Sequence, residues 1–132
     1  QIIKPELLSV PRYGIINVHG SLLPDYRGCL PSFWHLYNDE KTGGATVHFM
    51  SEEIDDGGII KQESVDISDC RTMYKLISRT KRLGGELMLQ AIMEITGGKA
   101  EIKQNDIARG RYYTWPSVEQ AKEFRNKGYR LI

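Results

Sequence analysis

Two polar side chains stand at the end of a short apolar run near the N-terminus. The run Gly14–Val18 contains Asn17 and is followed directly by His19. Because side chains two residues apart in a strand leave the same face, Asn17 and His19 should point together into one site. An Asn amide can donate to a developing oxyanion, and a His can move a proton or, when charged, stabilise that oxyanion. The pair is therefore typical of acyl-type transfer through a tetrahedral intermediate.

A carboxylate from a second segment could complete this site. The segment Ser51–Gly58, called the acidic turn below, holds Asp55 and Asp56 ahead of two glycines that let the backbone turn tightly. A carboxylate beside His19 would favour the charged imidazole and fix its orientation. The alternative is that the aspartates form a solvated turn and that Asn17 and His19 are turn residues whose side chains only make hydrogen bonds at the end of a strand.

The other residues with reactive side chains point to structure more than to chemistry. His48 lies inside a strand pattern and His35 beside aromatic residues of a helix pattern, so both are predicted to be structural. The three histidines lack a compact ligand spacing, and we predict no metal site. Cys29 as a nucleophile has little support, since a lone cysteine is usually inert.

Composition limits the setting of this chemistry. The chain has 132 residues, enough for one compact domain, and a formal net charge of +1, which does not support broad nucleic-acid binding. Its two cysteines, Cys29 and Cys70, form neither a disulfide framework nor a metal spacing, and no apolar run is long enough to cross a membrane. A cytoplasmic localisation with no membrane partner is therefore expected.

Strand and helix patterns alternate along the chain, which favours an α/β fold with at least part of the sheet parallel. Ser68 and Asp69 are expected to cap the long helix, Gly97 and Gly98 to end it, and the Ser117 segment to form a capping box. The predicted strands are Gly14–Val18, Ala45–Met50 and Ile59–Val65, and the predicted helices are Lys4–Leu8, Pro31–Asn38, Thr72–Ile95 and Ser117–Asn126.

Two separated motifs, NVHGSLLPDYRGCLPSFW and TGGATVHFMSEEIDDGGIIKQ, resemble the folate-dependent formyltransferases, in particular the catalytic domain of the methionyl-tRNA and sugar-nucleotide types. The resemblance covers Ile3–Gly98. It implies a three-layer, Rossmann-like α/β fold, and because the chain opens abruptly at Gln1, the fold's N-terminal strand–helix units are expected to be lacking. Residues 1–98 would then be the C-terminal half of the catalytic domain, and 99–132 an extension with a short helix.

The resemblance also implies roles. Asn17, His19 and Asp55 match the family's catalytic residues, with Asp56 as a second choice for the acid. The family's formyl donor is 10-formyltetrahydrofolate, used in one-carbon metabolism. A primary amine attacks the formyl carbon, and Asn17 and charged His19 would hold the oxyanion. The donor is expected along Met50, Ser51, Glu52, Ile54 and Asp55. The loop beside the acceptor would be Ser21, Leu22, Leu23, Pro24 and Arg27.

The acceptor amine is less well defined by the sequence. The continuation Arg27-Gly28-x-x-Pro31-x-x-Trp34 is similar to the methionyl-tRNA and sugar-nucleotide branches, and within them favours an amino-sugar nucleotide. Methionyl-tRNA is the alternative acceptor. A formyltetrahydrofolate hydrolase, with water as acceptor, and a truncated folate-binding module without activity are rivals of other classes. Basic residues near the C-terminus indicate a solvated helix face, with a phosphate or nucleotide contact as the lesser alternative.

Overall fold

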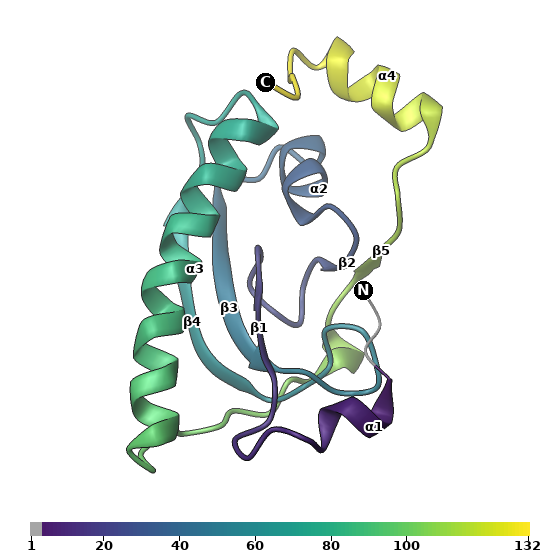
Figure 1. Ribbon diagram of the computed structural model, residues 1–132. Coiled ribbons are helices and arrows are strands. Elements are labelled where there is room, and N and C mark those ends of the chain that lie inside the picture. The colour runs from purple at the N-terminus through teal and green to yellow at the C-terminus, as the bar shows by residue number, and fades with distance from the viewer. Residues whose placement is uncertain (1–3) are drawn as a thin grey trace.

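A three-stranded sheet forms the centre of the molecule. The computed structural model describes residues 4–132 (Figure 1), so residues 1–3 of the predicted catalytic half lie outside the described part. Strands β1 (Ile16–His19), β3 (Thr42–Phe49) and β4 (Ile59–Asp66) lie in the order β1-β3-β4. Two further short strands, β2 (Arg27–Gly28) and β5 (Tyr112–Tyr113), form a separate pair. The predicted α/β class is confirmed.

Four α-helices accompany the strands in the described residues. They are α1 (Pro5–Leu8), α2 (Pro31–Tyr37), α3 (Met73–Thr96) and α4 (Val118–Asn126), with a 3₁₀ turn at Ile107–Arg109. All four begin within one residue of their predicted start. Between residues 4 and 132 no helix combines the length and the apolar character that crossing a membrane requires.

The helix caps agree with the sequence except at the start of α3. Ser117 accepts from the Gln120 backbone N–H while the Gln120 side chain accepts from the Ser117 N–H, which completes the predicted capping box. The N-cap of α3 is Thr72, whose hydroxyl accepts from the Lys75 N–H. The prediction of Ser68 and Asp69 as caps is wrong, because the Asp69 carboxylate is instead paired with side chains of the first two turns of α3.

Both pairings of the central sheet are antiparallel, and the prediction of a partly parallel sheet is wrong for it. The acidic turn joins β3 to β4 without a crossover helix, and a connection of that kind can only reverse the chain. Helix α2 lies at the end of the sheet where β1 finishes, so the chain also reverses between β1 and β3 (Figure 1). Among the named strands of residues 4–132, the parallel pair is β2 with β5, and Thr72 and Arg130 form an isolated parallel bridge.

The alternation of side chains along β3 separates a core from a polar layer. Ala45 and Val47 are fully buried in an apolar cluster with Leu87 and Ala91 of α3. The intervening residues face the opposite side, where the hydroxyl of Thr46 donates to the Ser21 carbonyl. Helix α3 therefore covers one face of the sheet, and the loop that follows β1 covers the other.

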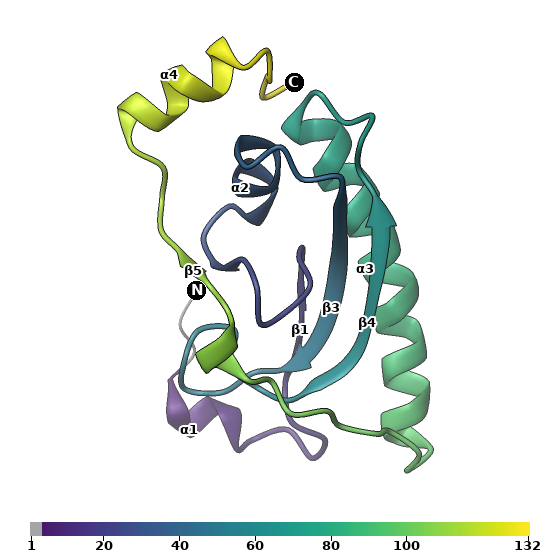
Figure 2. The ribbon, with the colours of Figure 1, turned by 180° about the vertical axis from the view of Figure 1, so that it is seen from behind.

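The C-terminal segment returns over the molecule after α3. Residues 99–113, called the strap below, run from the end of α3 past the acidic turn to β2 (Figure 2). Lys103 and Ile59 exchange two backbone hydrogen bonds, and β5 then pairs with β2. Beyond the strap, Phe124 of α4 is buried against Phe33 of α2, with ring centroids 4.6 Å apart. The C-terminal residues thus take part in the core.

Two adjacent glycines in α3 should respond oppositely to alanine. A Cβ at Gly84 would overlap Val18 Cγ1, a stiff β-branched side chain between Asn17 and His19, whereas Gly85 has nothing within 4 Å. Gly85→Ala should raise the free energy of unfolding by about 1 kcal/mol through helix propensity. Gly84→Ala should lower it by about 1–3 kcal/mol through overpacking. Urea unfolding of the two variants checks this, and equal shifts would contradict the packing of α3 on β1.

Candidate active site

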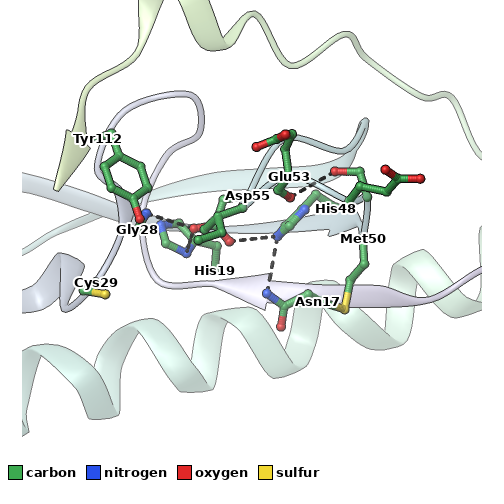
Figure 3. Close-up of a pocket in the computed structure, with 12 residues that line it drawn as sticks. Asn17, His19, Gly28, Cys29, His48, Met50, Glu53, Asp55 and Tyr112 are labelled. Atoms are coloured by element: carbon green, nitrogen blue, oxygen red, sulfur yellow. Dashed lines mark hydrogen bonds and ion pairs between the residues drawn. The ribbon is translucent and has the colours of Figure 1, made fainter. Parts of the chain in front are cut away.

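Asn17 and His19 lie on the same face of β1, as predicted. Asn17 is opposite His48 and His19 is opposite Thr46 in the antiparallel register, so all four side chains lie on the face of the sheet turned away from α3. The intervening Val18 points to the other face, against Gly84 of α3. Figure 3 shows Asn17, His19 and His48 directed into one cavity.

Asp55 reaches the same place from the acidic turn. It has a left-handed backbone, with φ at 52°, and its side chain is 11% exposed. One carboxylate oxygen accepts from the Gly28 backbone N–H at 2.9 Å and lies 3.5 Å from His19 Nδ1. The other lies 3.8 Å from His48 Nε2. The carboxylate is therefore placed between the two imidazoles, as Figure 3 shows.

His19 has an oxygen acceptor near each of its two ring nitrogens. Its Nε2 lies 2.8 Å from the Tyr26 carbonyl oxygen, which can only accept, so this nitrogen carries a proton. Its Nδ1 faces the Asp55 carboxylate, a second acceptor. The 3.5 Å separation is longer than a charge-assisted hydrogen bond of about 2.7–2.9 Å, which leaves Nδ1 free to turn to another acceptor. The side chain is 7% exposed and thus almost removed from water.

His48 is arranged as a neutral acceptor. Its Nδ1 donates to the Phe49 carbonyl at 2.8 Å, which leaves the Nε2 lone pair to accept from the Asn17 side-chain amide at 3.4 Å. Burial lowers the pKa of His48 below its ordinary value of 6.5. One N–H of the Asn17 amide is thereby occupied by His48, and the other is available to an oxygen in the cavity.

The cavity has a volume of about 280 Å³, near the lower end for small-molecule sites. It contains the predicted catalytic residues and the predicted donor residues of the acidic turn. Its lining is Asn17, His19, Gly28, Cys29, His48, Met50, Ser51, Glu52, Glu53, Ile54, Asp55 and Tyr112.

The predicted acceptor-side loop lies behind this cavity. Ser21 and Leu23 are buried, Leu22 contacts Gly44, and all three belong to the layer that packs on β3. Pro24 follows them, outside the cavity lining. The Arg27 guanidinium donates two hydrogen bonds to the Ile54 carbonyl, at 3.2 Å and 2.8 Å. Arg27 thus supports the acidic turn from outside the cavity.

Sequence reasoning missed some residues of the cavity. It places His48 in a structural role, whereas the structure places this side chain against both Asn17 and Asp55. The signal would have been the antiparallel register, which puts His48 opposite Asn17. Tyr112 comes from the strap, far beyond Asp55 in the sequence, and nothing local in the sequence predicts that approach. Cys29 lines the cavity as a free, half-buried thiol.

Two buried histidines should make the protein sensitive to acid. Burial lowers the pKa of His35 and of His48 from 6.5 in the folded chain. Below about pH 6.5 the unfolded chain therefore binds protons that the folded chain does not, and stability falls with falling pH. Each histidine contributes up to about 1.4 kcal/mol per pH unit. Urea unfolding between pH 7 and 5 should show a shallower pH slope for His35→Gln, and an unchanged slope would contradict the burial of a neutral ring.

Formyltransferases are among the known proteins that resemble this chain. The family model described as "Formyl transferase" matches residues 1–92. The methionyl-tRNA formyltransferase of Fusobacterium nucleatum is 37% identical over 106 residues, 80% of this chain and 34% of the relative. That of Pelotomaculum thermopropionicum is 42% identical over 100 residues, 76% of this chain and 32% of the relative. The chain thus spans about a third of the length of the curated relatives it matches.

Solved structures show the same fold. The sugar 3N-formyl transferase WlaRD, solved in the presence of dTDP and 5-N-formyl-THF, superposes with a TM-score of 0.77 at 28% identity, over 86% of this chain and 41% of WlaRD. The formyltransferase PseJ from Anoxybacillus kamchatkensis gives a TM-score of 0.77 at 24% identity, over 96% of this chain and 64% of PseJ, which supports the fold alone. The predicted formyltransferase fold is confirmed, and the chain belongs to the formyl transferase family.

Proposed function

We propose that this chain carries the catalytic residues of an enzyme that transfers a formyl group from 10-formyltetrahydrofolate to the primary amine of an amino-sugar nucleotide. The observation that carries the proposal is the convergence of Asn17, His19 and Asp55 in one cavity. An amide donor, an imidazole with acceptors on both nitrogens, and a buried carboxylate are the groups that a tetrahedral oxyanion intermediate needs. In this proposal residues 1–98 are the C-terminal half of the catalytic domain and 99–132 an extension.

The reaction follows from the positions of these groups. The amine nitrogen attacks the formyl carbon, and the carbonyl oxygen becomes an oxyanion that accepts from the free N–H of Asn17 and from charged His19. Asp55 balances the imidazolium and takes the proton that the attacking amine loses. The oxyanion then re-forms the carbonyl as the bond from the formyl carbon to N10 of the folate breaks, Asp55 passes the amine's proton to N10, and the formamide and tetrahydrofolate leave.

The donor side is assigned to the acidic turn. Met50, Ser51, Glu52 and Ile54 line the cavity next to Asp55 and would lie along the folate ring. WlaRD, the solved relative at 28% identity, was crystallised with a formyl-folate, which supports this class of donor. The two free cysteines and the expected cytoplasmic setting agree with a folate enzyme of one-carbon metabolism.

The acceptor has two candidates. WlaRD is a sugar 3N-formyl transferase, and the similarity of this chain to it supports an amino-sugar nucleotide as the acceptor. Methionyl-tRNA is the second candidate, because the two curated relatives described above, at 37% and 42% identity, are methionyl-tRNA formyltransferases.

Release of tetrahydrofolate from 10-formyltetrahydrofolate tests the proposal. The chain is incubated with the donor alone, then with a panel of amino-sugar nucleotides, and then with methionyl-tRNA. Release that depends on an amino-sugar nucleotide, with formation of its formamide, is the expected result. Release with methionyl-tRNA only would replace the acceptor. Release with the donor alone would identify a hydrolase, and donor binding without release would identify a binding module.

A further inference from the structure

The turn that carries Asp55 is held from two sides. On one side the Gly28 N–H and the Arg27 guanidinium donate to Asp55 and to the Ile54 carbonyl. On the other side lies Asn105, a residue of the strap that is 7% exposed. Its side-chain amide donates to the Asp55 carbonyl at 2.8 Å and to the Gly57 carbonyl at 3.3 Å.

The backbone of the turn depends on such support. Asp55 has a φ of 52°, in the left-handed region that residues with a side chain rarely adopt. The peptide that follows it is fixed by the hydrogen bond from Asn105, because that bond ends on the Asp55 carbonyl oxygen. A change of the Asp55 backbone from this left-handed conformation would redirect its Cα–Cβ bond and so move the carboxylate, which lies 3.5 Å from His19 Nδ1.

The Asn105 amide is used for its N–H donors. Its Oδ1 is buried and has no hydrogen-bond partner. Among the buried side-chain nitrogen and oxygen atoms of residues 4–132, it is the one in this position. A buried acceptor without a partner is unfavourable, and an apolar side chain of similar size would avoid that penalty. The two donated hydrogen bonds are what the amide adds at this position.

The neighbouring strap residues fix where Asn105 sits. Lys103 exchanges two backbone hydrogen bonds with Ile59, the first residue of β4. Ile102 packs against Gly58, and a Cβ added to Gly58 would lie 2.5 Å from Cγ2 of Ile102. These contacts lie directly beside the acidic turn. They fix the register of the strap and so hold the Asn105 side-chain amide next to the turn.

We propose that Asn105 is a positioning residue of the active site, which aims the Asp55 carboxylate at His19 by holding the carbonyls of Asp55 and Gly57. Residue 105 lies beyond residue 92, where the match to the family model ends. The strap thereby belongs to the catalytic apparatus although it supplies no group to the reaction. As a statement about catalysis, the inference rests on the proposed function.

Nitrogen NMR of the histidine rings tests the inference without turnover. Asn105→Asp keeps the size of the side chain and replaces the donor by an acceptor, and Asn105→Ala removes the side chain. Both should move the His19 Nδ1 signal in the direction in which Asp55→Asn moves it, with the His35 signals unchanged. Gln104→Ala, at the exposed neighbour on the strap, is the matched control and should leave His19 unchanged. An unchanged His19 signal in a folded Asn105 variant would overturn the proposal.

The reverse measurement covers the case in which both Asn105 variants unfold. If the two groups are coupled, the coupling acts in both directions. Asp55→Asn should therefore shift the side-chain amide signals of Asn105 and leave those of Gln104 in place. Amide signals of Asn105 that do not respond would overturn the inference.

Kinetics then separates this inference from the proposed function. For Asn105→Asp, kcat for formyl transfer should fall about 10- to 100-fold, as for other residues that orient a catalytic group, while KM for the folate changes little. A parent chain without formyl transfer would refute the function and leave the NMR result standing. An equal loss of kcat in Gln104→Ala, or a loss in KM alone, would overturn the positioning role.

Discussion

His19→Ala should reduce formyl transfer by about 10³-fold and leave the affinity for the folate nearly unchanged. The ring lies at the end of β1 with the Tyr26 carbonyl on one nitrogen and Asp55 on the other, so its removal takes away the group proposed to stabilise the oxyanion. The folate is expected along the acidic turn, whose residues the substitution does not alter. Steady-state rates and folate binding by fluorescence measure the two effects separately.

Two results would alter this assignment. Equal activity of His19→Ala and the parent would remove His19 from the mechanism. A parallel loss of folate binding and activity would assign His19 to ground-state binding instead of the transition state. Because the ring is buried, urea unfolding of the variant is the control that excludes a general loss of structure.

Asp55→Asn should lower kcat by about 10²- to 10³-fold, whereas Asp56→Asn should stay within a few-fold of the parent. The two substitutions make the same chemical change at adjacent positions, which makes Asp56→Asn a matched control. Only Asp55 is in the cavity lining among the described aspartates, with oxygens 3.5 Å and 3.8 Å from His19 and His48. The side-chain amide oxygen that Asp55→Asn introduces could still accept from the Gly28 N–H, so the loss would report the charge.

The opposite order of the two effects would show that Asp56 provides the carboxylate. Equal, small effects of both substitutions would mean that His19 works without a charged partner. Initial rates at saturating donor and acceptor distinguish these cases, since kcat under those conditions reports the chemical step or a later one.

The elements of the fold were predictable where the local signal was strong. The capping box at Ser117, the glycines after α3 and the apolar run of β1 lie within a few residues of what they specify. The direction of the strands was not predictable in this way. An alternation of strand and helix patterns is typical of parallel sheets, but α2 lies at the end of the sheet, and its place in space reverses the chain.

The site shows the same limit in finer detail. Asn17 and His19 could be paired from their spacing, because two residues of one strand share a face. His48 and Tyr112 could not be added, since one depends on the register between β1 and β3 and the other on the path of the strap. The predicted N-cap of α3 was wrong for a similar reason, because Asp69 forms an ion pair with Arg79 in the second turn of the helix.

The path of the strap has a consequence for how the protein matures. During synthesis the N-terminal parts of a chain leave the ribosome first and begin to fold there. The sheet and α3 use residues up to Thr96, whereas the acidic turn receives two of its hydrogen bonds from Asn105. On the ribosome the sheet can therefore form while the turn still lacks this support. A nascent chain would form its sheet before its catalytic geometry, and released chains that end at residue 98 and at residue 113 would display that order.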